Sequence, residues 1–110
     1  MKLSIRIFNM GNGDSARFIQ DESVDPHAHQ AYKQVNVDLE KVLRFEHKQS
    51  EGVLAFGEFF DTYISELGEV FLYHDADPGD LTFNASNEVT FKDVITKLIA
   101  LPNYEMQASK

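Results

Sequence analysis

The stretch YHDADPGDLTF, residues 73–83, predicts a tight turn between two β-strands. Its Pro-Gly pair fits the two central positions of a type II turn, because proline fixes φ at the first position and glycine accepts a positive φ at the second. Short apolar runs rich in aromatic residues, Val70–His74 and Leu81–Asn84, flank this turn. We therefore expect an antiparallel hairpin over residues 70–84.

The same turn places Asp75, Asp77 and Asp80 close to His74. A calcium-binding loop needs oxygen ligands at alternate positions and glycine at the sixth position. Counted from Asp75, glycine stands at the fifth position and Asp80 at the sixth, so the pattern fails. We interpret the aspartates as part of a solvated turn that presents negative charge. A divalent-metal or enzymatic site built from these four side chains is the alternative.

A second hairpin is predicted at the start of the chain. Leu3–Met10 alternates apolar and polar residues, and Ala16–Gln20 follows after the turn signal Gly11-Asn12-Gly13. A helix is predicted next, because Asp25 can cap free N–H groups and Pro26 fits the first helical position. Apolar residues at helical spacing extend this helix to near Lys48.

The segment from Val53 to Leu67 predicts a second helix, which Gly68 would end. Its apolar residues recur at helical spacing, and its acidic residues gather on the opposite side. The run VLAF, residues 53–56, is also compatible with a short strand, and we leave that alternative open. The last predicted helix has Thr90 as its N-cap, and Pro102 ends it.

These elements follow the order ββ-αα-ββ-α, which predicts an α+β fold. We expect an antiparallel sheet built from two β-hairpins, with about three helices packed on one face. Residues 1–110 are expected to form a single compact domain, with 103–110 as a tail that is loose at its tip.

Charge is distributed unevenly along the chain. The net charge is −8, yet residues 49–91 contain nine acidic residues and neither lysine nor arginine. Such a segment disfavours direct binding to a phosphate backbone, which relies on clustered basic residues. It favours instead a partner of opposite charge.

Several kinds of active site are excluded by composition. The chain has no cysteine, which removes disulfides, thiolate metal sites and cysteine nucleophiles. Neither a G-x-S-x-G elbow nor a phosphate-binding G-K-[ST] motif occurs. His27 and His29 stand in the first turn of a predicted helix, where residues two apart diverge. We therefore expect no catalytic residues, no metal site and no cofactor.

The sequence predicts a cytoplasmic protein without a signal peptide or a membrane-spanning segment. We expect a non-enzymatic acidic protein that inhibits a basic, nucleic-acid-acting protein, either a nuclease toxin or a nucleic-acid-binding complex. A dimeric structural or regulatory subunit is a further alternative, and the oligomeric state stays open. The residues expected to bind the partner are Glu58, Phe59, Asp61, Glu66, Glu69, Tyr73, Asp75, Asp77 and Asp80.

Overall fold

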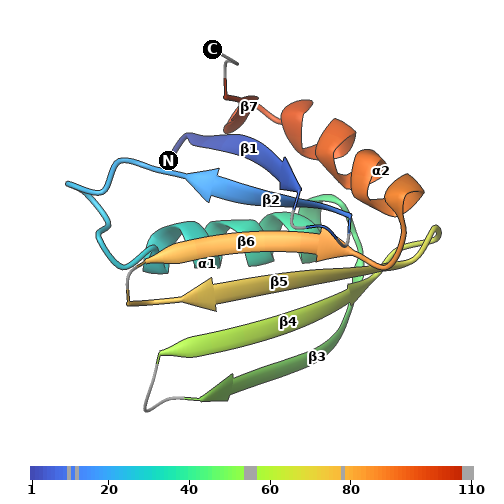
Figure 1. The fold of residues 1–110 in the computed structure, drawn as a ribbon, viewed down its shortest axis with the longest axis horizontal. Coiled ribbons are helices and arrows are strands. Elements are labelled where there is room, and N and C mark those ends of the chain that lie inside the picture. Colours follow the sequence, from blue (N-terminus) through green and yellow to red (C-terminus); the bar gives the residue numbers. More distant parts are fainter. Residues whose placement is uncertain (10, 12, 54–56, 78, 108–110) are drawn as a thin grey trace.

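The computed structural model describes residues 1–107 apart from 10, 12, 54–56 and 78. In these residues, seven strands form one sheet in the order β3-β4-β5-β6-β2-β1-β7 (Figure 1). The strands are β1 (Leu3–Asn9), β2 (Asp14–Ile19), β3 (Glu46–Val53), β4 (Glu58–Ile64), β5 (Glu69–Asp75), β6 (Asp80–Ala85) and β7 (Tyr104–Met106). Neighbouring strands are antiparallel except β1 and β7, which run parallel, so the sheet is mixed.

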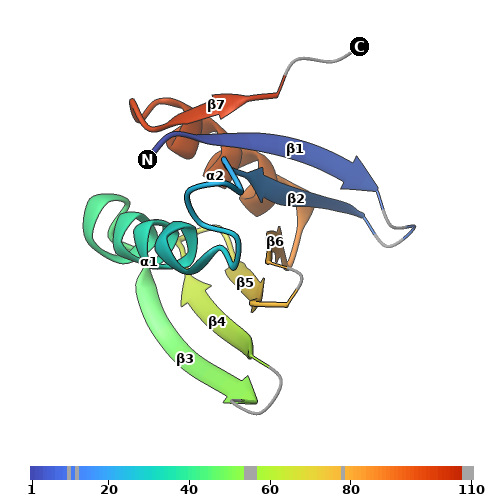
Figure 2. The same ribbon diagram turned by 90° about the vertical axis from the view of Figure 1, so that its left-hand side faces the viewer.

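Two α-helices pack against one face of this sheet. They are α1 (His29–Val37), which continues into the single π-helical turn η1 (Asp38–Val42), and α2 (Glu88–Ile99). Their buried residues belong to the same hydrophobic core as the inward-facing residues of β1, β2, β5 and β6. Figure 2 shows α1 lying against one side of the sheet. Among the described residues, neither helix is both long and apolar enough to cross a membrane.

Both predicted hairpins are present, as β1–β2 and β5–β6. The predicted role of Asp25 at the start of the first helix is also present. Its buried carboxylate accepts hydrogen bonds from the backbone N–H groups of His29, Gln30 and Ala31. The predicted place of Pro26 at the first helical position is wrong, since the helix begins at His29 and its N-cap residue is Ala28.

The predicted fold, an antiparallel sheet of two hairpins with about three helices in the order ββ-αα-ββ-α, is wrong. In the described residues the sheet is mixed and has seven strands, and the second predicted helix is β-structure. Its described residues form the end of β3 and the whole of β4, which pair antiparallel with each other. β4 is rich in aromatic and β-branched residues, and these favour a pleated surface over a helix. Residues 54–56, for which the sequence allowed either a strand or a helix, lie outside the described residues. The same holds for Met10 of the first predicted strand and for Asn12 and Pro78 of the predicted turns.

Three further boundaries differ from the prediction. The first helical segment ends at Val42, after which residues 46–53 form β3. The N-cap of α2 is Asn87, whose side chain accepts a hydrogen bond from the N–H of Thr90. Tyr104, in the segment assigned to a tail, is buried in β7 and pairs with Leu3.

The turn between β5 and β6 packs against the start of α1. His27 Nδ1 donates a hydrogen bond to the carbonyl of Ala76 at 2.9 Å. Gly79 has φ of +97°, and a Cβ atom on it would lie 2.4 Å from the carbonyl oxygen of Pro26. Glycine is therefore required at position 79 both by the backbone conformation and by this close approach.

Candidate protein-binding face

The sheet has one covered face, under α1 and α2, and one open face. Alternate residues of a strand point to opposite faces, and burial follows this alternation. In β5, Val70, Leu72 and His74 are buried under the helices, and Phe71 and Tyr73 face away from them. No described helix packs on the open face, so its side chains are accessible to a partner.

Aromatic side chains gather on the open face. Phe60 of β4 and Phe71 of β5 are 44% and 38% exposed, although both belong to central strands of the sheet. The Phe60 ring lies 4.7 Å from the Tyr73 ring, measured between centroids. We call Phe60, Phe71 and Tyr73 the aromatic patch. Exposed aromatic rings held on a rigid sheet are typical anchors of protein interfaces.

Three carboxylates form a row across neighbouring strands beside this patch. Glu58 of β4 lies opposite Asp75 of β5, and Asp75 lies opposite Asp80 of β6. Residues directly opposite in antiparallel strands point to the same face, so the three side chains are neighbours on the open face. We call Glu58, Asp75 and Asp80 the acidic row. Like charges in this arrangement repel one another, which costs folding free energy.

Tyr73 joins the aromatic patch to the acidic row. Its hydroxyl lies 3.3 Å from carboxylate oxygens of both Glu58 and Asp75, so its one proton can be donated to either. Partial burial, together with the charges of Asp75 and Glu58, raises the pKa of Tyr73 to about 12. The phenol therefore stays protonated at neutral pH and serves as a hydrogen-bond donor to the row.

The acidic side chains of residues 49–91 do not form one continuous surface. Asp77 is exposed in the turn beside the acidic row, where its N–H donates to Asp75. Glu66 and Glu69 lie at the other end of β4 and β5, and Glu69 is 3.4 Å from the ammonium of Lys48. The aromatic patch thus lies between two separate acidic groups.

The open face changes character toward β2. Arg17 of β2 is paired with Asp80, at 3.4 Å between Nη2 and Oδ1. Arg6 of β1 lies directly opposite Arg17 and is exposed. The acidic row is therefore confined to β4, β5 and β6, and the neighbouring positions on β2 and β1 are basic.

The structure places Asp61 in the interior, away from the open face. It is 3% exposed and lies on the covered face of β4. Its carboxylate accepts hydrogen bonds from Tyr32 and Ser50 and contacts His47 Nε2 at 3.0 Å. Burial and the contact with Asp61 raise the pKa of Tyr32. Asp61 therefore stabilises the packing of α1 on the sheet and cannot reach a partner directly.

Phe59 also lies on the covered face. Its ring packs against the rings of Tyr32 and His74, at 5.8 and 5.9 Å between centroids. The exposed aromatic side chain in this part of β4 is instead Phe60, one residue later. A shift of one residue along a strand moves a side chain to the other face of the sheet.

The alternative site of His74 with Asp75, Asp77 and Asp80 is not brought together. His74 is fully buried under α1, whereas Asp75 and Asp80 lie on the open face. Among the described residues, no group of three or more histidine or acidic side chains is arranged to hold a metal ion. The geometry therefore does not favour a metal site in this turn.

Comparisons of this chain with protein-family models, curated proteins and solved structures give no match.

Proposed function

We propose that this protein is a non-enzymatic binding protein that docks a basic protein on the open face of its sheet. The acidic row beside the aromatic patch carries the proposal. The partner we infer is a nucleic-acid-acting protein, either a nuclease toxin or a nucleic-acid-binding complex. Bound there, the acidic row would occupy the basic surface that the partner uses for phosphates.

The energetics of the row support this function. Glu58, Asp75 and Asp80 face one another's charge without a described lysine or arginine between them, apart from Arg17 at one end. Lysine or arginine side chains of a partner would relieve that repulsion and increase the association rate. The aromatic patch would then provide the apolar contact that slows dissociation.

The same geometry disfavours direct binding of nucleic acid. A nucleic-acid-binding sheet combines aromatic rings with basic side chains that contact phosphates. Here the rings of Phe60 and Tyr73 stand beside carboxylates, which repel a phosphate backbone.

The proposal is tested by affinity capture with two matched variants. The row variant carries Glu58→Gln, Asp75→Asn and Asp80→Asn. The control variant removes the same charge from exposed acids elsewhere: Glu22→Gln, Glu40→Gln and Glu105→Gln. Each protein is immobilised, exposed to lysate of the native host and to purified nuclease toxins, and eluted with a salt gradient. Captured proteins are identified by mass spectrometry and tested for inhibition by the soluble protein.

A basic protein that is inhibited by the wild type and the control variant, and at least tenfold less by the row variant, would support the proposal. Equal capture and inhibition by the two variants would exclude the acidic row as the partner-binding site. Self-association that is lost on Phe60→Ala would show instead that the open face is a homodimer interface. Light scattering over a concentration series measures this outcome.

A further inference from the structure

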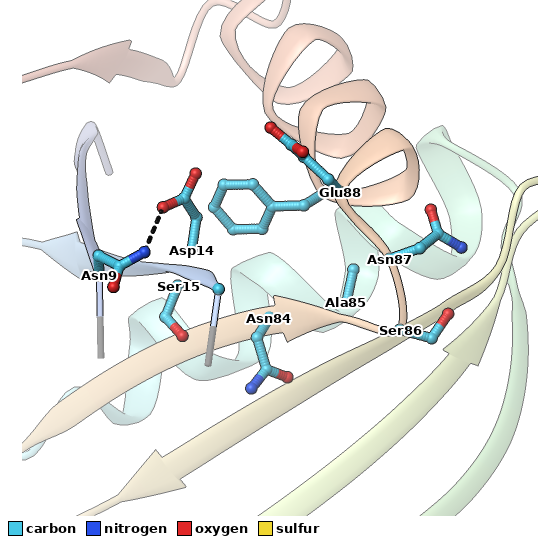
Figure 3. A pocket seen from close by; sticks show the side chains of 10 residues that line it. Asn9, Asp14, Ser15, Asn84, Ala85, Ser86, Asn87 and Glu88 are labelled. Atoms are coloured by element: carbon cyan, nitrogen blue, oxygen red, sulfur yellow. Dashed lines mark hydrogen bonds between the residues drawn. The ribbon is translucent and has the colours of Figure 1, made fainter. Parts of the chain in front are cut away.

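Two hollows of the surface meet beside the aromatic patch. The first, of about 220 Å³, lies on the open face between Phe8, Phe71 and Tyr73. The second, of about 440 Å³, lies between the β1–β2 hairpin and the start of α2 (Figure 3). Ser15 and Asn84 line both hollows, so the two adjoin at these residues, and we call the pair the groove.

The first hollow has apolar walls. Phe8 comes from β1 and Phe71 and Tyr73 come from β5, and β2 and β6 lie between these two strands. Thr82 of β6 also lines it, opposite Arg17 of β2. A hollow with aromatic walls on an otherwise polar surface suits an apolar side chain, which would be removed from water on entering it.

The second hollow has acidic walls. Figure 3 shows Asp14 and Glu88 reaching toward it from β2 and from the first turn of α2. Among the described residues no lysine or arginine lines it, and the rest of its lining is mainly amides, hydroxyls and Phe91. Several of those amides are already engaged, since Asn9 donates to Asp14 and Asn87 caps α2. The polar groups that a ligand could contact are therefore mainly the carboxylate of Asp14 and the side chains of Ser15 and Asn84.

An ammonium group of the chain itself already lies at the rim of this hollow. Lys92 Nζ is 3.0 Å from the Glu88 carboxylate. A hydrogen bond and the negative charge of Glu88, with a smaller contribution from Asp14, raise the pKa of Lys92. Glu88 is thus already paired with Lys92, whereas Asp14 has no lysine or arginine partner among the described residues.

We propose that this groove binds an extended segment of the partner, with an apolar side chain in the first hollow and a lysine or arginine side chain in the second. The two side chains would stand two residues apart, because alternate residues of an extended segment point to the same side. This inference rests on the proposed function and names the element of the basic partner that is recognised. Asp14 would pair with the cation, and Phe8 would pack against the apolar side chain.

The test uses three acetylated and amidated peptides in NMR titrations of the ¹⁵N-labelled protein. The first is Lys-Phe-Thr-Arg-Lys, the second has alanine in place of phenylalanine, and the third has glutamine in place of arginine. We expect the first peptide to shift the amide signals of Ser15 and Asn84. The alanine and glutamine peptides should each bind at least fivefold more weakly.

Two groove variants, Phe8→Ala and Asp14→Asn, locate the two contacts. Asp14→Asn should weaken the arginine peptide at least threefold and leave the glutamine peptide unchanged, since only the arginine peptide has a cation two residues after phenylalanine. Phe8→Ala should weaken the phenylalanine peptide and not the alanine peptide. Glu22→Gln serves as the matched control, and thermal unfolding verifies that each variant is folded.

The results separate this inference from the proposed function. Loss of the captured partner by the row variant, with retention by Phe8→Ala and Asp14→Asn, would contradict binding in the groove and would support binding at the acidic row. Equal binding of all three peptides, or no shift at Ser15 and Asn84 at millimolar peptide, also overturns the groove. If the row variant binds and inhibits the partner as well as the wild type does, the proposed function is contradicted whatever the peptides show.

Discussion

The Nε2 atom of His74 lies 2.9 Å from the backbone carbonyl of His27. Because a carbonyl oxygen only accepts, His74 must carry its proton on Nε2. This bond joins the middle of the sheet to the segment that leads into α1. The His74 side chain is fully buried, and the ring of Tyr32 stacks on it at 4.6 Å between centroids. His74 is therefore a packing residue of the α1–sheet interface.

Replacing His74 should strongly destabilise the protein. We expect His74→Ala to lower the free energy of unfolding by about 3 kcal/mol, because it removes a buried ring and leaves the His27 carbonyl without its donor. Urea denaturation measures this change, and long-range ¹⁵N NMR of the wild type should show the Nε2–H tautomer. A loss below about 1 kcal/mol would contradict the assigned role.

Asp61→Asn should also destabilise the fold, for a different reason. The carboxylate oxygens accept from Tyr32 and Ser50 and contact His47, whereas an amide would turn an N–H group toward these donors. We expect a loss of about 2 kcal/mol, measured by chemical denaturation. The exposed Asp77→Asn is the control and should change stability by less than about 0.5 kcal/mol. Partner binding by folded Asp61→Asn should match the wild type, and a specific loss of binding would place Asp61 in the interface.

Asp75→Asn should make the protein more stable. Asp75 faces Glu58 on one side and Asp80 on the other, and removing its charge relieves both repulsions. The Asn side chain keeps an oxygen that can accept from the N–H of Asp77. We expect a gain of about 0.5 kcal/mol in denaturant unfolding, together with weaker, less salt-dependent partner binding. A loss of stability would mean that the hydrogen bonds which Asp75 accepts from Tyr73 and Asp77 outweigh the repulsion within the row.

Stability should fall steeply in alkaline solution. An unperturbed tyrosine has a pKa of 10.0, whereas that of Tyr73 is raised to about 12 and those of Tyr32, Tyr63 and Tyr104 are raised further, chiefly by burial. The folded state thus holds its phenolic protons more tightly than the unfolded state. This contribution to stability is complete below pH 10 and is lost as the pH rises from 10 through 12.

Ultraviolet absorbance of tyrosinate during a pH titration measures this behaviour. The folded protein should show little ionisation at pH 10, and Tyr73→Phe should remove the first step that appears on further increase. Ionisation of one tyrosine per chain near pH 10 in the folded state would contradict the burial of these side chains.

The sequence predicted both hairpins and α2 because turn and cap residues act locally. Gly79 of the β5–β6 turn is an example, since its positive φ is a local backbone conformation that glycine adopts readily. β4 could not be predicted in the same way. Its open face carries Phe60 and its covered face carries Asp61, so neither face shows the apolar-in, polar-out alternation that indicates a strand. The spacing of its aromatic residues fits a helix equally well.

The candidate face was predicted in part. The acidic row contains three of the residues selected from the sequence, because clustering of charge is visible without a fold. Phe60, Phe71 and Asp14 were missed, because their exposure depends on strands that are distant in sequence. A strand assignment for residues 58–64 would have placed Phe60 beside Glu58 and Thr62 on one face, and Asp61 with Tyr63 on the other.

The parallel pairing of β1 with β7 also determines how the fold would respond to a pulling force. Leu3 pairs with Tyr104 and Ile5 with Met106, and the N–H of Gln107 donates to the carbonyl of Ile5. Tension applied outward at residue 1 and at residue 107 would run along these two strands in opposite directions. The bonds between them lie across that direction, so they would be sheared together and not opened one at a time. The pairing of the first strand with the last described strand thus makes the sheet resistant to extension from these two points.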